Sequence, residues 1–152
     1  MKEASVGKTV NADVRVQAPP SKAHTLRALI IASLAKGESH ILKPLLGQDQ
    51  LNVMRCLREL GVELEPSDDE VRVVGAAGRF APSGRELNVG ESGVGMNFLT
   101  SAACLSGAPV TLTGAERITQ RPIAEVVGGL RQLGCGIDYL GREGFPPIRI
   151  AG

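Results

Sequence analysis

The sequence predicts an α/β fold built from two tandem copies of one unit, with elements in the order β-α-β-α-β-β. Residues 57–64 read Leu-Arg-Glu-Leu-Gly-Val-Glu-Leu, and residues 130–137 return to this pattern as Leu-Arg-Gln-Leu-Gly-Cys-Gly-Ile. Residues 34–37 (Leu-Ala-Lys-Gly) return in the same way as 104–107 (Cys-Leu-Ser-Gly). In each case a run with helical apolar spacing ends at a glycine and a strand-like run follows, which indicates a duplicated helix end.

The first copy spans residues 19–78 and begins with an amphipathic helix. Its predicted elements are a helix over 23–36, a strand over 39–43, a helix over 49–60, and strands over 62–65 and 71–74. Helical spacing places apolar side chains on one face of each helix: Leu26, Leu29, Ile30 and Leu34 in the first, and Val53, Met54, Leu57 and Leu60 in the second. A further strand is predicted over 10–18, within a leading segment of residues 1–18.

The second copy spans residues 84–152 and repeats this order after a Gly-rich link at 76–85. Its predicted elements are a strand over 86–89, a helix over 92–106, a strand over 110–113, a helix over 122–133, and strands over 136–140 and 148–151. Pro122 suits a first helical turn, where its missing N–H is not needed. The apolar stripe of this last helix contains Ile123, Val126, Val127, Leu130 and Leu133.

Composition excludes several classes of protein. The 152 residues carry 17 basic and 16 acidic side chains, a balance that gives no general field for nucleic acid or a membrane surface. Aromatic residues are only 3%, which disfavours binding by base stacking. No apolar run approaches the ~20 residues that span a bilayer. The polar start of the chain shows no secretory signal, so we expect a cytoplasmic protein.

Cysteine and histidine give no sign of metal binding. The three cysteines, Cys56, Cys104 and Cys135, lack paired spacing, and we interpret them as reduced thiols that pack as small apolar groups. The only two histidines, His24 and His40, are interpreted as structural or surface residues. We therefore predict no metal site.

The start of the first helix is the first candidate anion site. Ser21 is a plausible N-cap, Lys22 follows at the helix start, and Arg27 lies further along the helix. A lysine opposes the helix dipole at this end unless an anion compensates, so an anion site is one interpretation and a solvated cap is the other. Asp49 begins the next helix, where spacing favours a capping role over coupling to a ligand.

Two further helix starts have comparable features. Residues 89–95 (Val-Gly-Glu-Ser-Gly-Val-Gly) allow close backbone approach, but they match neither a P-loop nor a dinucleotide fingerprint. Arg117 and Arg121 flank the start of the last helix, and their guanidinium groups suit carboxylate or phosphate. The alternative interpretation of residues 89–95 is a tight connection without a ligand. The alternative for Arg117 and Arg121 is a pair of exposed surface arginines.

Together these stretches resemble the enolpyruvyl transferase family, in particular the branch that acts on shikimate 3-phosphate. The resemblance covers nearly the whole chain from about residue 14 on. It is carried by Ser21-Lys22 with Arg27, the helix end 57–61, the turn 90–95, Arg121-Pro122-Ile123, and Gly-Phe-Pro-Pro-Ile-Arg at 144–149.

The resemblance implies a fold and a reaction. The family fold is an inside-out α/β barrel, with two lobes of three such units in a much longer chain, so this chain is expected to be an N-terminal part. The reaction moves the carboxyvinyl group of phosphoenolpyruvate onto the 5-hydroxyl of shikimate 3-phosphate, without a metal or organic cofactor. The implied partners are these two small molecules, with no nucleic acid or membrane.

The resemblance also implies roles for individual residues. Lys22 would be catalytic and contact both substrates, Arg27 would hold the shikimate side, and Gly93 and Arg121 would bind phosphoenolpyruvate. Further candidates are Ser21, Asp49, Glu91 and Ser92.

The chain departs from the family pattern at Ala23, Glu91, Val94 and Asn97, where two hydroxyls and an arginine are lost and a carboxylate is gained. Because the later units are absent, we expect no transferase activity from this chain alone, and self-association through the surface that those units would cover. One alternative is an inactive binding or structural module. A weaker one is the sister UDP-N-acetylglucosamine transferase, which has Asn after its Lys and a cysteine near 114–117, whereas this chain has neither.

Overall fold

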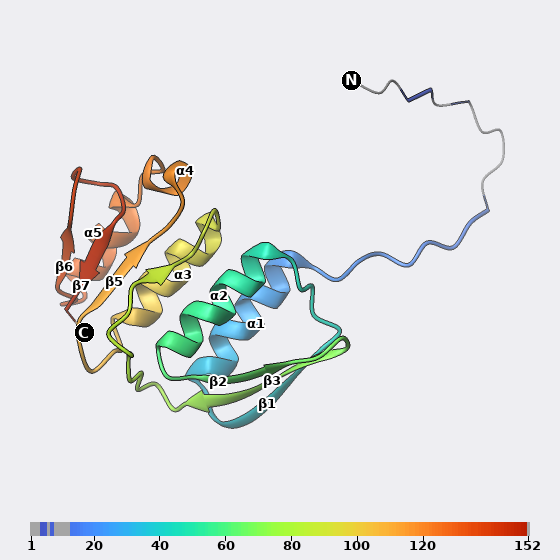
Figure 1. The fold of residues 1–152 in the computed structure, drawn as a ribbon, viewed down its shortest axis with the longest axis horizontal. Coiled ribbons are helices and arrows are strands. Elements are labelled where there is room, and N and C mark those ends of the chain that lie inside the picture. Colours follow the sequence, from blue (N-terminus) through green and yellow to red (C-terminus); the bar gives the residue numbers. More distant parts are fainter. Residues whose placement is uncertain (1–3, 6, 8–12, 152) are drawn as a thin grey trace.

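Three helices lie side by side between two small sheets in the computed structural model, which describes residues 4–5, 7 and 13–151. Helices α1, α2 and α3 run in the same direction, with one sheet below α1 and α2 and the other beside α3 (Figure 1). Among the described residues, no helix is both long and apolar enough to cross a membrane.

The first unit has a three-stranded antiparallel sheet that packs against α1. Its elements in chain order are α1 (Lys22–Leu34), β1 (Lys36–Leu42), α2 (Gln48–Glu59), β2 (Glu63–Pro66) and β3 (Glu70–Ala76). The strand order is β1-β3-β2, and both pairings are antiparallel. All five predicted elements between residues 23 and 74 are therefore confirmed, with bounds shifted by a few residues.

The second unit contains the same arrangement with an added edge strand. Its elements are β4 (Leu87–Asn88), α3 (Gly93–Ala103), β5 (Val110–Thr113), α4 (Glu116–Thr119), α5 (Ala124–Gln132), β6 (Ile137–Tyr139) and β7 (Ile148–Ile150). The strand order is β4-β5-β7-β6, in which β5, β7 and β6 pair like β1, β3 and β2 and β4 pairs in parallel with β5. The boundaries 19–78 and 84–152 stay predictions.

The two glycine stops have the same geometry in both units. Gly61 and Gly134 adopt φ values of +88° and +92°, in the left-handed region that a side chain disfavours. The amide of the next residue then reaches back to the last helical turn: Val62 N donates to Leu57 O, and Cys135 N donates to Leu130 O, each at 3.0 Å. This 6→1 bond is the Schellman pattern, so glycine ends both helices for the predicted reason.

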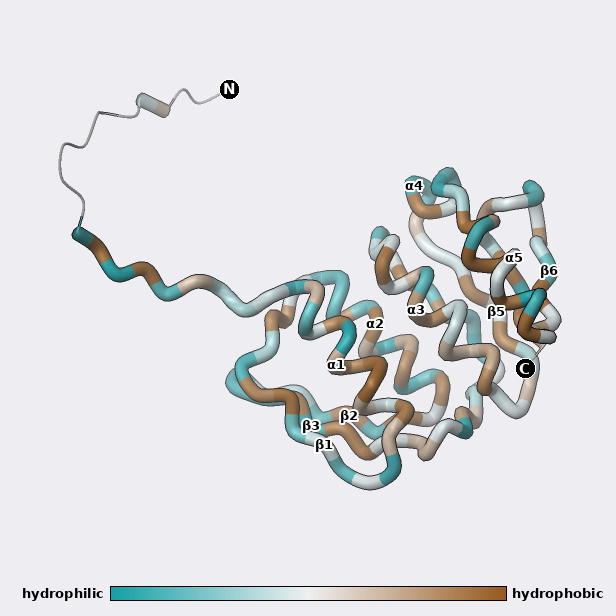
Figure 2. Tube along the Cα trace, turned by 180° about the vertical axis from the view of Figure 1, so that it is seen from behind, coloured by the Kyte–Doolittle hydropathy of each residue, from teal (hydrophilic) through white to brown (hydrophobic). Residues whose placement is uncertain are grey.

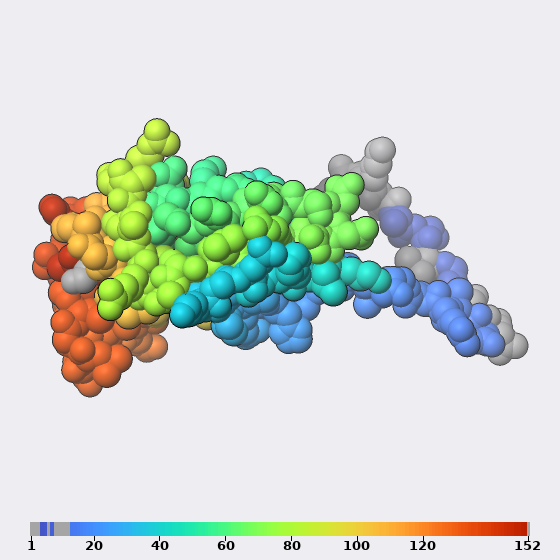
Figure 3. Space-filling model, turned by 90° about the horizontal axis from the view of Figure 1, so that it is seen from below, coloured from blue at the N-terminus to red at the C-terminus, as the bar shows by residue number. Residues whose placement is uncertain are grey.

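The leading strand predicted over 10–18 is wrong for its described part. Residues 13–18 run away from the helices without strand pairing (Figures 2 and 3). Figure 2 shows apolar and polar positions alternating along this segment. Val14 and Val16 are 73% and 84% exposed. Alternation alone does not make a strand, because a strand needs a neighbouring strand for its hydrogen bonds. Residues 10–12 lie outside the described part.

The last helix differs from the prediction at both ends. It begins at Ala124 with Ile123 as N-cap, so Pro122 precedes the helix, and the short helix α4 was not predicted. Leu133 is 82% exposed rather than part of the apolar stripe. The chain leaves the helix at this residue to reach Gly134, so helical periodicity no longer places its side chain.

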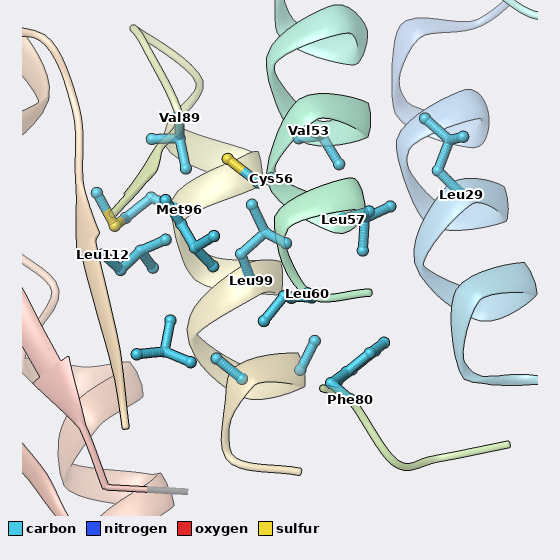
Figure 4. Packing of buried hydrophobic residues seen from close by; sticks show 14 of the residues in the cluster. Leu29, Val53, Cys56, Leu57, Leu60, Phe80, Val89, Met96, Leu99 and Leu112 are labelled. Atoms are coloured by element: carbon cyan, nitrogen blue, oxygen red, sulfur yellow. The ribbon is translucent and has the colours of Figure 1, made fainter. Parts of the chain in front are cut away.

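A shared apolar core joins the two units. Four leucines are fully buried and belong to one cluster that spans both sheets: Leu57 of α2, its C-cap Leu60, Leu99 of α3 and Leu112 of β5 (Figure 4). The cluster also contains Leu29 of α1. Because α2 and α3 pack directly against each other, neither unit has a complete core by itself.

Leu99→Ala is expected to destabilise the protein by about 2–5 kcal/mol, because it leaves a cavity where the two units meet. Leu133→Ala, at a mostly exposed leucine, is the matched control and is expected to change the free energy of unfolding by less than about 0.5 kcal/mol. Urea unfolding of both variants measures the difference. Equal effects would show that Leu99 is not part of a shared core.

Candidate functional site

Helices α1, α2 and α3 begin at the same end of the molecule, next to α4 (Figure 1). The first N–H groups of a helix have no partner within it, and the helix dipole is positive there. Ser21 and Ser92 are the N-caps of α1 and α3, and their hydroxyls accept hydrogen bonds from His24 N and Gly95 N at 3.3 and 3.0 Å. Three parallel helices thus direct their positive ends toward one region, which favours an anion.

A cavity of about 490 Å³ lies at this end. Its walls come from the starts of all three helices and from the segment that contains α4. The lining residues are Lys22, Asp49, Glu91, Gly93, Val94, Met96, Asn97, Arg117, Ile118, Arg121, Pro122 and Ile123. Five of the predicted site residues therefore meet in one place: Lys22, Asp49, Glu91, Gly93 and Arg121.

Lys22 is held at the cavity by α2. Its Nζ lies 2.5 Å from an Oδ of Asp49, whose side chain is 20% exposed. Gln50, itself buried, donates from Nε2 to Lys22 O at 3.0 Å and so fixes the start of α2 against the start of α1. The preferred prediction that Asp49 caps its helix is wrong. Gly47 is the N-cap and Asp49 lies in the first turn, where it is free to pair with Lys22.

Arg121 reaches the start of α3 because residue 93 has no side chain. A Cβ at Gly93 would lie 3.0 Å from the Arg121 Nη1 atom, which is tighter than ordinary contact. Arg121 follows α4, and its amide donates to Ile118 O at 3.0 Å. The guanidinium thus lies over the first turn of α3, where an anion would meet it together with backbone N–H groups.

The remaining predicted residues lie outside the cavity. Ser92 is fully buried as the N-cap of α3. Ser21, likewise engaged as an N-cap, borders a different hollow near β1. Arg27 borders a small apolar hollow with Ile30, Ile31 and Phe98. Five residues advance about 140° around a helix, so Arg27 points away from the Lys22 side, and its role stays a prediction.

Arg117, from the third candidate anion stretch, and Asn97, one of the departures from the family pattern, also line the cavity, although the resemblance implied no role for either. The spacing of Arg117 and Arg121 had marked that stretch as basic, but the turn that brings Arg117 to the cavity is α4, whose four residues leave little periodic signal. Asn97 lies one turn along α3 from Gly93, so helical spacing from the glycine-rich turn would have found it.

The thiols and other metal-ligating groups that the structure describes form no metal site. Within the described part of the chain, no group of three or more His, Cys, Asp or Glu side chains is placed to hold a metal ion. Burial raises the pKa of the Cys56 thiol to about 12, so it stays protonated and packs as an apolar group. This agrees with the interpretation of Cys56 as a structural thiol.

Comparison of the fold with solved structures gives the class of protein. The structure matches EPSP synthase from Acinetobacter baumannii with a TM-score of 0.83 and 28% sequence identity. The match covers 90% of this chain and 32% of that chain. The fold is therefore that of an enolpyruvyl transferase, as the resemblance implied.

Sequence comparison gives the family. The family model described as EPSP synthase (3-phosphoshikimate 1-carboxyvinyltransferase) matches residues 6–152, and the chain belongs to this family. The 3-phosphoshikimate 1-carboxyvinyltransferase of Methanoculleus marisnigri is 43% identical over 97% of this chain, and that of Cupriavidus necator is 41% identical over 99%. The chain spans 35% of the length of each of these curated relatives.

Gly93→Ala is expected to weaken anion binding about tenfold, because the added Cβ pushes the Arg121 guanidinium from the start of α3 and removes a charge-assisted contact. Gly128→Ala is the matched control, since a Cβ there meets nothing within 4 Å. Titration with inorganic phosphate, followed by NMR, measures both. Unchanged affinity in Gly93→Ala would show that Arg121 does not bind the anion.

Proposed function

We propose that this chain forms one face of the active site of a 3-phosphoshikimate 1-carboxyvinyltransferase, which moves the carboxyvinyl group of phosphoenolpyruvate to the 5-hydroxyl of shikimate 3-phosphate. The observation that carries the proposal is the meeting of Lys22, Gly93 and Arg121 in one cavity at the positive ends of three helices. Both substrates are phosphorylated carboxylates, and this cavity supplies positive charge and backbone donors of the kind that bind such anions.

The reaction proposed here is an addition followed by an elimination. The 5-hydroxyl loses its proton as its oxygen bonds to C2 of phosphoenolpyruvate, and the double bond between C2 and C3 becomes single as C3 gains a proton. The elimination then expels inorganic phosphate as C3 loses a proton, which restores the double bond. In this proposal Lys22 neutralises both anions and Arg121 holds phosphoenolpyruvate. Preorganised positive charge of this kind lowers the free-energy cost of bringing two anions together. The proposed addition and elimination need no metal or organic cofactor.

The cavity does not have enough positive charge for both substrates. Asp49 already pairs with Lys22, and Glu91 lies near Arg117, so most of the positive charge is balanced before any ligand arrives. Because the chain spans 35% of the length of its relatives, we propose that further basic groups from the rest of such a protein complete the site.

An inactive binding module is the second candidate, and two cavity residues favour it. Val94, which is 43% exposed, brings an apolar side chain to the start of α3, and Glu91 brings a carboxylate to an anion site. Among residues 4–5, 7 and 13–151, no feature favours the weaker alternative, the UDP-N-acetylglucosamine reaction.

The proposal also includes a cellular location and association between copies of this chain. Small-molecule chemistry on soluble phosphate esters fits a cytoplasmic location. Ile31 is 67% exposed and lies in the apolar hollow beside Phe98, a surface through which copies of this chain could associate.

Lys22→Ala is expected to lower the affinity for shikimate 3-phosphate and phosphoenolpyruvate by at least about tenfold, because it removes the charge placed to contact both. Lys36→Ala, which removes the same charge at the other end of α1, is expected to leave both affinities unchanged. Isothermal titration calorimetry measures the dissociation constants of both substrates for each variant. Equal loss in the two variants would contradict a site at Lys22.

Turnover by the purified chain alone is expected to be undetectable, since the cavity lacks charge for two multiply charged substrates. A coupled assay for phosphate release, with both substrates saturating, measures it. Turnover at the rate of a full-length relative would show that this third of the length is sufficient.

A further inference from the structure

The ionic side chains of the cavity are almost matched in number. Three are basic (Lys22, Arg117 and Arg121) and two are acidic (Asp49 and Glu91). Asp49 contacts Lys22, and Glu91 lies 4.0 Å from Arg117. Among the described residues, Arg121 has no carboxylate within ion-pair distance. An anion that enters the cavity therefore meets one unpaired guanidinium and a second one that already has a carboxylate beside it.

Glu91 is held at the cavity through the two residues that precede it, whose backbone carbonyls are tied to α4 and α2. Gly90 O accepts from Ala115 N at 2.8 Å, which ties the glycine-rich turn to the start of α4, two residues before Arg117. Asn52 Nδ2 donates to Val89 O at 3.3 Å and ties the same turn to α2.

Glycine is required at the position next to Glu91. Gly90 has φ of +61°, and a Cβ there would lie 2.2 Å from the Asn52 amide nitrogen. The turn is therefore constrained by close packing, which fixes the backbone of Glu91 beside the cavity.

We propose that Glu91 sets the affinity of the cavity for anionic substrates by competing with them for Arg117. The Arg117 and Glu91 side chains are 70% and 61% exposed, so their ion pair is screened by water and weak enough for a ligand to displace. The fixed turn keeps the displaced carboxylate nearby, where it repels the bound anion. Arg117 is thus a substrate-binding residue whose contribution Glu91 reduces.

This inference rests on the proposed function, because it takes the cavity to be the substrate site. Removing the charge of Glu91 frees Arg117 and removes a repulsion over a few ångströms. The expected gain in affinity for phosphoenolpyruvate is about two- to tenfold at low salt, and smaller at high salt, where exposed charges are screened.

The experiment is a calorimetric titration of the chain with phosphoenolpyruvate alone. The variants are Glu91→Gln, Arg117→Gln and the double variant. Glu63→Gln on β2 makes the same charge change at an exposed position remote from the cavity and serves as the control. We expect tighter binding in Glu91→Gln alone, no change in Glu63→Gln, and loss of the gain when Arg117 is also replaced, because the two side chains act on each other.

The possible outcomes separate the two proposals. Binding by wild type with no gain in Glu91→Gln beyond that in Glu63→Gln would overturn the inference and leave the proposed function standing. Weaker binding in Glu91→Gln, or a full gain that persists without Arg117, would also overturn it. No binding by any variant would contradict the proposed function itself.

Discussion

The packing of α1, α2 and α3 in one direction is the constraint on which the site depends. Their buried faces share a core that includes Leu29, Leu57 and Leu99, so the three helices cannot turn relative to one another. Parallel packing brings three positive helix ends together, which is costly unless negative charge lies nearby. The core therefore creates both the anion site and the need for an anion.

The cost of bringing three positive helix ends together explains the acidic residues of the cavity. Asp49, in the first turn of α2, pairs with Lys22, the first residue of α1. Glu91, just before the N-cap of α3, lies near Arg117 of α4. An acid near a helix start stabilises the helix by about 0.3–1 kcal/mol, so each also favours its own helix. The protein thus partly neutralises the site with its own carboxylates, which the substrates must replace or outweigh.

Most helices and strands could be predicted from local patterns in the sequence, whereas contacts between helices at the site could not. Helical spacing and the glycine stops at Gly61 and Gly134 predicted nearly every element, because the left-handed cap is a property of the local backbone. The pairing of Lys22 with Asp49 depends on how two helices pack, which spacing within one helix does not reveal. The prediction of a leading strand was wrong for the same reason, because a strand needs a hydrogen-bonded neighbouring strand and local alternation does not reveal one.

The most direct test of the central claim is to map the bound anion on the chain by backbone amide chemical shifts. Titration with phosphoenolpyruvate and shikimate 3-phosphate is predicted to give the largest shifts at Lys22, Gly93, Val94 and Arg121, where the helix starts meet. Residues of β1 and β3, at the far sheet, are predicted to stay unchanged. Largest shifts away from the helix starts, or none at saturating ligand, would contradict the account.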